Sequence, residues 1–288
     1  MRRFILATMG LFVMVSTILA QFGDGQGEYI FPVGIAIDVD GNTYITELGN
    51  DRVQKLNASQ EWMANWGRFG SDSLEFNDPI GIAVSADGDI LVNDSGNHRI
   101  VVYDPDGRCR CIIALPDSSV PWGLAAANGF LYVTDLAQGT VDVLTMDGRL
   151  VGTVGQPGHG EGQLDKPRGV ALDGDGRIWV VDAGNDRVQV FSPDGQQVRS
   201  FGAYGDGDGE FDSPSGIAVT GQGQVLVTDT GNDRFQEFDL DGAFKSQAGS
   251  SGTDPVQFLN PTGIAVDAAG NLYIVDTDNH RVQVLNAQ

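Results

Sequence analysis

An acidic side chain recurs six times along this sequence, each time at the end of a short β-branched run. The six acids are Glu47, Asp94, Asp135, Asp182, Asp229 and Asp276. In five of the six copies an arginine follows five residues later, at Arg52, Arg99, Arg187, Arg234 and Arg281. A carboxylate at a strand end accepts hydrogen bonds from the next turn and pairs with a nearby guanidinium. Because a catalytic site needs different residues in different copies, this repetition predicts a structural role for the acids and arginines.

The third copy departs from this pattern. It runs Asp135-Leu-Ala-Gln-Gly-Thr140, so the acid is kept while the asparagine and the arginine of the other copies are lost. The linker in front of this copy, residues 115–120, is also several residues shorter than the others. We therefore expect Asp135 to be the acid that contacts a ligand.

Metal ligands are the next chemistry to consider. Zinc hydrolases and lyases use about three convergent histidine or carboxylate ligands, whereas the histidines of this chain are spread over His98, His159 and His280. Two of them, His98 and His280, occupy a turn position that other copies fill with aspartate. The pattern predicts surface turn residues and no zinc site.

Calcium is an alternative cofactor, because three copies place an aspartate at the end of their first apolar run. These are Asp38, Asp173 and Asp267. Calcium takes about six to eight oxygen ligands, and the other copies interrupt the set with Ser85, Ala127 and Thr220. Asp-Gly pairs are also ordinary hairpin turns. The sequence thus predicts no cofactor, with calcium at the three aspartates as the hypothesis left open.

The elements that position these side chains are short strands. The stretch from Pro167 to Phe191 holds three apolar, β-branched runs with Gly-rich and Asn-containing turns between them, which indicates antiparallel strands joined by hairpins. The unit opens with Pro-x-Gly at Pro32, Pro79, Pro121, Pro167, Pro214 and Pro261. Self-similarity at 42 to 47 residues is typical of propellers. We predict an all-β fold: a six-bladed β-propeller of four-stranded antiparallel blades, forming a single domain over residues 21–288.

The residue between Pro and Gly should lie at the mouth of the central channel, where propellers usually bind their ligands. In chain order these residues are Val33, Ile80, Trp122, Arg168, Ser215 and Thr262. Trp122 offers a large apolar face, and Arg168 in the next blade offers a forked hydrogen-bond donor. We predict a ligand contact at these positions, with Asp135 nearby. The alternative is that Trp122 packs between blades and Arg168 pairs with an acid.

The two ends of the chain should meet in the sixth blade, whose fourth strand the N-terminal part must supply. Alignment with residues 197–201 predicts Ile18–Phe22 for this closing strand. Residues 1–20 also resemble a secretory signal peptide, because Arg2 and Arg3 precede an apolar run that ends at Ala20. This predicts a secreted or periplasmic protein, cleaved after Ala20 and closed by a short strand. The alternative is an uncleaved segment that anchors the protein in a membrane.

The formal net charge of −22 limits the choice of partners. Such a surface repels phosphate backbones and anionic lipids, so we expect neither nucleic acid nor a membrane surface as partner. The two cysteines, Cys109 and Cys111, lie two apart on a predicted strand, too far for an undistorted disulfide. We expect a monomer whose partner is a protein, a peptide or a small ligand.

The repeated unit resembles the NHL repeat family. The resemblance rests on Pro-x-Gly-Ile-Ala-Val-Asp, then Gly-Asn-x-Tyr-Ile-Val-Asp, then Gly/Asp-Asn-x-Arg-Val-Gln-Val-Phe, and it covers residues 22–288. It implies a six-bladed β-propeller with its axis lined by the first strand of each blade. The family does not imply one function. Its members include protein-binding modules, RNA-binding modules and extracellular sensor domains, and a related enzyme, the peptidyl-hydroxyglycine amidating lyase, uses the same ring with zinc.

The resemblance also bears on catalysis. It implies that the lyase carries zinc-binding histidines between the Pro and the Gly, and none of the six residues at that position here is a zinc ligand. The sequence therefore favours an exported, non-enzymatic binding scaffold. The alternative is a metal-assisted hydrolase or lyase, amidating-lyase-like or lactonase-like, in which acids such as Asp38, Asp173 and Asp267 meet at the axis around a cation.

Overall fold

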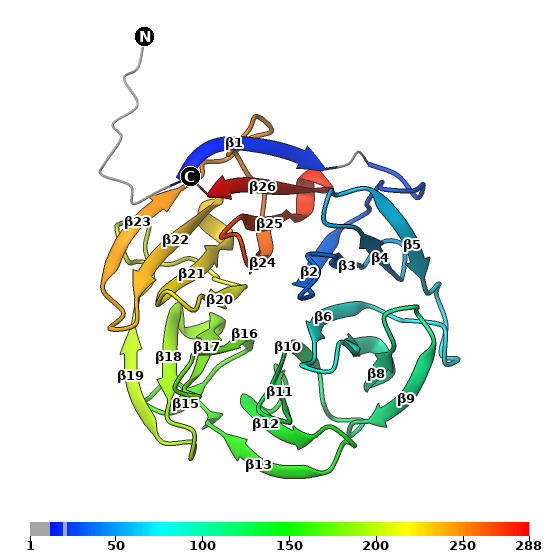
Figure 1. Ribbon diagram of the computed structural model, residues 1–288. Coiled ribbons are helices and arrows are strands. Elements are labelled where there is room, and N and C mark those ends of the chain that lie inside the picture. Colours follow the sequence, from blue (N-terminus) through cyan, green and yellow to red (C-terminus); the bar gives the residue numbers. More distant parts are fainter. Residues whose placement is uncertain (1–11, 20–21, 288) are drawn as a thin grey trace.

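The computed structural model describes residues 12–19 and 22–287, and it places six four-stranded antiparallel sheets around a central axis (Figure 1). The prediction of an all-β, six-bladed propeller is confirmed. In this part of the chain the helical elements are the short 3-10 turns η1 (Ser95–Asn97), η2 (Ala183–Asn185), η3 (Thr230–Asn232) and η4 (Thr277–Asn279). None of the described helices has the length and apolar character needed to cross a membrane.

The first three blades follow one another along the chain. Blade 1 consists of β2 (Pro32–Ile37), β3 (Thr43–Glu47), β4 (Arg52–Leu56) and β5 (Trp62–Trp66). Blade 2 consists of β6 (Pro79–Val84), β7 (Ile90–Asp94), β8 (Arg99–Tyr103) and β9 (Cys109–Ala114). Blade 3 consists of β10 (Pro121–Ala127), β11 (Phe130–Asp135), β12 (Thr140–Thr145) and β13 (Leu150–Val154).

A short parallel pair, β14 (Gln156–Pro157) and β15 (Gln163–Leu164), lies in the linker to the second half of the ring. Blade 4 consists of β16 (Pro167–Leu172), β17 (Ile178–Asp182), β18 (Arg187–Phe191) and β19 (Gln197–Phe201). Blade 5 consists of β20 (Ile217–Val219), β21 (Gln224–Asp229), β22 (Arg234–Asp239) and β23 (Phe244–Ala248). Blade 6 consists of β24 (Pro261–Val266), β25 (Leu272–Asp276), β26 (Arg281–Ala287) and β1 (Phe12–Leu19).

The hydrophobic core lies between the blades. Six buried clusters fill the six interfaces between neighbouring blades, with Trp179 as the largest buried side chain. The second strands β3, β7, β17 and β25 are buried at every position, because both of their faces pack against other blades. The outer strands β5, β19 and β23 alternate between exposed and half-buried residues, the period of two expected for a strand with one face in solvent.

The glycine of each Pro-x-Gly lets neighbouring blades approach closely at the axis. A Cβ atom on Gly216 would overlap the carbonyl oxygen of Thr262 in the next blade. The same carbonyl accepts a hydrogen bond of 2.6 Å from the hydroxyl of Thr228. Thr46 makes the same 2.6 Å bond to the carbonyl of Ile80. Side chains of the second strand thus fasten one blade to the backbone of the next.

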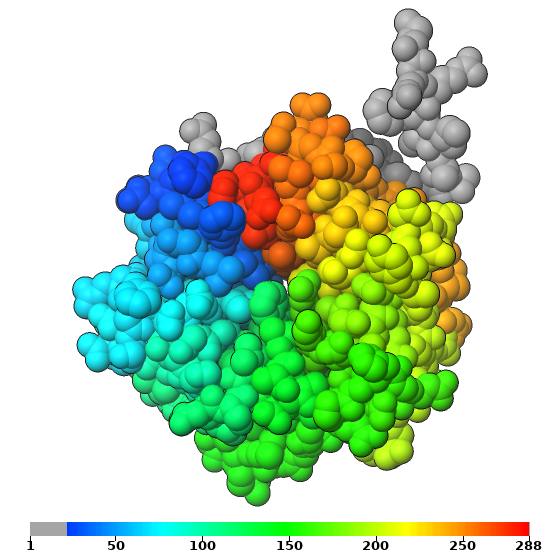
Figure 2. Space-filling model, turned by 180° about the vertical axis from the view of Figure 1, so that it is seen from behind, coloured from blue at the N-terminus to red at the C-terminus, as the bar shows by residue number. Residues whose placement is uncertain are grey.

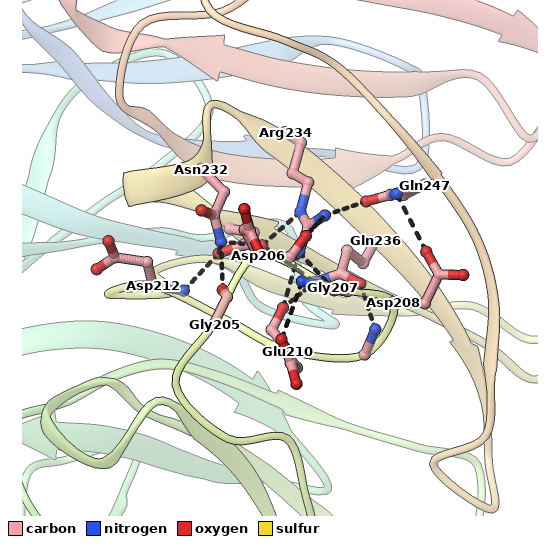
Figure 3. A network of polar contacts seen from close by, with 12 residues as sticks. Gly205, Asp206, Gly207, Asp208, Glu210, Asp212, Asn232, Arg234, Gln236 and Gln247 are labelled. Atoms are coloured by element: carbon pink, nitrogen blue, oxygen red, sulfur yellow. Dashed lines mark hydrogen bonds and ion pairs between the residues drawn. The ribbon is translucent and has the colours of Figure 1, made fainter.

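The repeated acid and arginine form a buried ion pair that holds the linker in front of each regular blade. Figure 3 shows Arg234 of blade 5 among the linker residues that it contacts. In blade 5, Arg234 Nε donates to Asp229 Oδ2 at 2.6 Å. Its Nη atoms donate to the carbonyl oxygens of Asp206, Gly207 and Glu210 at 2.8 to 2.9 Å. Equivalent pairs at 2.6 to 2.7 Å are Arg52–Glu47, Arg99–Asp94, Arg187–Asp182 and Arg281–Asp276. These acids and arginines position backbone, as a structural role requires.

The ring closes where the two ends of the described chain lie side by side, with the blue β1 beside the red β26 in Figure 1. Figure 2 shows from behind how the blue blade 1 lies against the red end of blade 6. Strand β1 pairs antiparallel with β26, with Ser16 opposite Leu285 and Leu19 opposite Val282. A buried cluster that joins Tyr273 of blade 6 to Ile45 of blade 1 closes the same gap from the inside.

The prediction of Ile18–Phe22 as the closing strand was wrong. Phe22 forms an isolated bridge with Tyr29, and Tyr204 forms the same bridge with Phe211. Phe22 therefore corresponds to Tyr204 and not to Phe201, which moves the closing strand three residues towards the N-terminus. The signal-peptide prediction for residues 1–20 rests largely on residues 1–11 and 20, which lie outside the described part of the chain.

Candidate functional site

The first strands of the six blades surround a narrow cavity of about 90 Å³ on the propeller axis. Its wall consists of the Pro-x-Gly segments and the aliphatic residues that follow them, such as Ile35, Ile82 and Leu124. Five of the six predicted channel positions line it, namely Val33, Ile80, Trp122, Ser215 and Thr262. The Thr262 hydroxyl donates to the carbonyl of Val33 at 2.9 Å, so it serves the contact between blades 6 and 1.

Arg168, the sixth predicted position, lies over Trp122 instead of lining the cavity. Its Cζ atom is 5.3 Å from the centre of the Trp122 ring, a cation–π arrangement. Its Nη1 atom donates to the carbonyl of Ser213 at 3.2 Å. Burial lowers the pKa of Arg168, while the charge of Asp186 opposes this, and an arginine stays charged at neutral pH. Among the described residues no carboxylate forms an ion pair with this guanidinium. Its remaining N–H groups can therefore donate hydrogen bonds to an anion.

Asp135, the acid predicted near these two residues, is held in a turn of its own blade. It lies opposite Pro121 in the pairing of β10 with β11, and it is not among the residues that line the cavity. Its Oδ1 atom accepts hydrogen bonds of 2.9 to 3.1 Å from the backbone N–H groups of Val120, Ala137 and Gln138. The carboxylate therefore belongs to the turn that follows β11.

The three calcium candidates are held apart, each in the turn after its own first strand. Oδ1 of Asp38 accepts hydrogen bonds from two backbone N–H groups of its turn, as do Oδ1 of Asp173 and Oδ1 of Asp267. Burial works to raise the pKa of Asp173, but hydrogen bonds from Trp179 and Arg177, with the Arg177 charge, lower it overall. Within residues 12–19 and 22–287, no three His, Cys, Asp or Glu side chains gather as metal ligands do.

The turn position of His98 and His280 has a function that the sequence analysis missed. Both residues have a left-handed backbone conformation, with φ of 50° and 53°. The Nδ1 atom of His280 accepts a 3.0 Å hydrogen bond from the backbone N–H of Phe31, just before the Pro-x-Gly of the next blade. Asp186 accepts the equivalent 2.7 Å bond from Ser213, whereas Nδ1 of His98 lies 2.7 Å from the carbonyl oxygen of Ser119, in front of the irregular blade 3. The sequence carried the signal, because this turn position holds Asp or His in every regular copy.

A comparison with protein-family models matches the NHL repeat at residues 76–103, 164–191, 211–238 and 258–285. These segments run from the linker to the third strand in blades 2, 4, 5 and 6. The chain is an NHL-repeat β-propeller. Blades 1 and 3 of this NHL propeller are not matched; blade 3 has lost the asparagine and the arginine of the repeat, whereas blade 1 keeps both as Asn50 and Arg52. A search of curated proteins finds no match to the sequence.

Solved structures share the fold of the NHL propeller at low sequence identity. A streptogramin B lyase is 16% identical with a TM-score of 0.68, over 96% of this chain and 98% of that chain. A gluconolactonase from Xanthomonas campestris is 18% identical with a TM-score of 0.70, over 91% and 88%. A nidogen/laminin complex is 22% identical with a TM-score of 0.61, over 75% and 79%. Because these structures include a lyase, a lactonase and a protein complex, the likeness establishes the fold and leaves binding and catalysis undistinguished.

Asp142 is a second residue that the sequence analysis missed. It lies opposite Val133 in the pairing of β11 with β12. Blade 4 has Gln189 at the equivalent place, opposite Val180. The repeats read Arg-Val-Gln or Arg-Phe-Gln in four blades, and blade 3 reads Thr-Val-Asp. Aligning the third strands therefore identifies Asp142 as a departure that accompanies the loss of the arginine.

Proposed function

We propose that this NHL propeller is a non-enzymatic binding protein whose ligand occupies the channel mouth at Trp122 and Arg168. The observation that carries the proposal is a half-buried guanidinium that stacks on an aromatic face and has no carboxylate partner in the described chain. It stands beside an aliphatic cavity. This combination suits a ligand that joins an apolar group to an anion, such as a carboxylate. A peptide, a protein segment or a small molecule can present both.

The energetics favour an anionic ligand over a neutral one. Stacking on Trp122 contributes about 0.5–2 kcal/mol and holds the guanidinium in one orientation before the ligand arrives. A hydrogen bond to a charged group contributes about 1.5–3 kcal/mol. Because the chain is strongly acidic, an anion that binds here must be recognised locally by Arg168, which makes this arginine the specificity determinant we propose.

A metal-assisted hydrolase or lyase is the alternative, because a lyase and a gluconolactonase share the fold. That function requires carboxylates at the axis, whereas Asp38, Asp173 and Asp267 are hydrogen-bonded within separate turns. We therefore favour binding. We further propose that the protein acts as a secreted or periplasmic monomer.

The test uses anilinonaphthalene sulfonate, which joins an aromatic group to an anion, and phenylnaphthylamine, its analogue without the sulfonate. We expect saturable binding of both, measured by fluorescence. Arg168→Gln should weaken sulfonate binding about tenfold, which corresponds to about 1.4 kcal/mol, and leave the neutral analogue unaffected. Trp122→Ala should weaken both probes.

The matched control is Arg199→Gln, which removes an exposed arginine that pairs with Asp241 on the outer strand of blade 4. This variant should bind both probes as the wild type does. Equal sulfonate affinity in Arg168→Gln and Arg199→Gln, with both variants folded by circular dichroism, would contradict the assignment of the channel mouth as the ligand site.

A further inference from the structure

Five blades of this propeller show how the chain itself binds a guanidinium. In blade 4, Asp182 Oδ2 accepts hydrogen bonds from Arg187 Nε at 2.7 Å and from Gln189 Nε2 at 3.0 Å. The Nη2 atom of Arg187 then donates to the carbonyls of Gly160 and Gln163 in the linker. One oxygen of the acid therefore accepts from the guanidinium, from the glutamine and from Asn185 Nδ2, and the linker covers the outer edge of the guanidinium.

Blade 3 keeps the acid and loses the groups that pair with it. Thr140 stands in place of the arginine, opposite Asp135, and Asp142 stands in place of the glutamine. Oδ1 of Asp135 still accepts backbone hydrogen bonds. The Asp135 residue is only 2% exposed, and its buried Oδ2 atom has no hydrogen-bond partner among the described residues. A buried charged acceptor without a partner is unusual in folded proteins and requires an explanation.

Asp142 adds a second carboxylate to the same place. It is half-buried, and the Thr153 hydroxyl donates to its Oδ1 atom at 3.2 Å. Asp142 holds the strand position of Gln189, whose Nε2 atom lies 3.0 Å from Asp182 Oδ2, so the strand register makes Asp142 and Asp135 neighbours on one face of the blade. Burial first, and then the negative charge of Asp135, raise the pKa of Asp142. A position that holds one acid and one arginine in other blades here holds two acids and no cation.

The linker of blade 3 is shorter than those of the regular blades and contacts the turn after β11, where Gln138 Nε2 donates to the carbonyl of Ser118 at 3.3 Å. In the regular blades, carbonyls located 24 to 28 residues before the arginine close over it. In blade 3 the segment between β9 and β10 comprises only residues 115–120. The turn beside it carries Ala137 and Gln138, both exposed. Asp142 is half-buried and is therefore the carboxylate open to solvent, whereas a cation that also binds the buried Oδ2 atom of Asp135 must displace this turn.

The geometry points to a guanidinium-binding slot formed by Asp135, Asp142 and Thr140, which accepts an arginine side chain of a partner protein. A planar, forked guanidinium matches a pair of carboxylates, and this chain uses that group at the same position five times. Calcium fits poorly, since it needs about six to eight oxygens. The net charge of −22 attracts a basic partner surface. The slot is separate from the channel mouth and does not depend on the function proposed there.

The first experiment titrates the isotope-labelled full chain with N-acetyl-arginine amide and follows its backbone amide signals by NMR. We expect saturable shifts confined to residues near Asp135, Gln138 and Thr140. N-acetyl-citrulline amide has the same shape without the charge and should bind at least tenfold more weakly. Arg168→Gln should leave the arginine response unchanged. Equal responses to arginine and citrulline, or no local response to arginine, would overturn the proposal.

The second experiment rebuilds the regular repeat inside blade 3. The double variant Thr140→Arg/Asp142→Gln supplies the missing guanidinium and glutamine from the chain itself. We expect this variant to melt at a higher temperature than the wild type and to lose the response to arginine amide. Asp142→Asn keeps the wild-type shape, so it stands in if the double variant fails to fold, and it should weaken the arginine response several-fold. An undiminished response in a folded variant contradicts the slot.

Discussion

Asp229 and Asp135 end the equivalent strands of blades 5 and 3, but their surroundings differ. Asp229 accepts hydrogen bonds from Arg234 and Gln236, at 2.6 and 3.0 Å on the same oxygen. Asp135 has neither donor and shares its site with Asp142. Because like charges placed close together destabilise a sheet, ionised Asp142 should lower the stability of the propeller.

The pH dependence of stability tests this at the level of one residue. The folded pKa of Asp142 is raised above the usual value of about 3.9, so the folded state binds its proton more tightly than the unfolded state does. Its contribution to stability is therefore present below about pH 3.9 and is lost as the pH rises through the raised pKa. Asp142→Asn should be more stable than the wild type at pH 7, by about 0.2–1 kcal/mol, with the difference vanishing in acid. Urea unfolding of both proteins at several pH values measures this.

Asp87→Asn is the control for this comparison, because Asp87 is exposed in the turn before β7. Its stability should follow that of the wild type at every pH. If Asp142→Asn were no more stable than the wild type at pH 7, the like-charge interaction with Asp135 would be absent.

At the scale of the elements, the contact between first strands decides how closely the blades pack. Gly216 and Gly221 both belong to blade 5, and neither has a positive φ. A Cβ atom on Gly216 would overlap the backbone carbonyl of Thr262, which cannot move without separating blades 5 and 6. Nothing lies within 4 Å of a Cβ atom on Gly221. Gly216→Ala should therefore lower the free energy of unfolding by about 1–3 kcal/mol or more, whereas Gly221→Ala should change it little.

Chemical denaturation of the two variants checks this expectation at equal protein concentration. Similar unfolding midpoints for Gly216→Ala and Gly221→Ala would show that the blades can separate at the axis without loss of stability. The close approach would then not be the reason for the repeated glycine.

Sequence periodicity predicted the strands because the signals for strands and tight turns are local. Gly41 and Gly88 have φ of 81° and 83°, as the hairpin turns require. The register of β1 depends on a pairing between distant segments, and two similar aromatic-Gly pairs, Phe201-Gly202 and Tyr204-Gly205, left the alignment ambiguous by three residues.

The sequence repeat also predicted the channel positions, since Pro-x-Gly marks the axis in every blade. It did not predict the contacts of the Arg168 side chain. Whether this guanidinium pairs with an acid or stacks on Trp122 depends on which side chains of the neighbouring blade reach it, and the sequence does not specify that contact.

At the scale of the whole molecule, the ring is closed by two contacts. The buried cluster around Tyr273 and Ile45 joins blade 6 to blade 1. The pairing of β1 with β26 covers an edge that would otherwise expose unpaired N–H and C=O groups from Arg281 to Ala287. If the signal peptide proposed for residues 1–20 were cleaved after Ala20, the cleavage would remove β1 and leave β26 as an open edge.

Two truncations separate these contacts. A chain that starts at Gln21 should still fold, because the buried cluster between blades 6 and 1 remains, but it should melt at a lower temperature and associate through β26 as its concentration rises. A chain that starts at Phe12 keeps β1 and should match the full chain in melting temperature and remain monomeric. Light scattering and thermal unfolding measure both properties. If the two truncated chains had the same melting temperature and both stayed monomeric, the β1–β26 pairing would contribute nothing to closure of the ring. A propeller without β1 would then be as stable as one that keeps it.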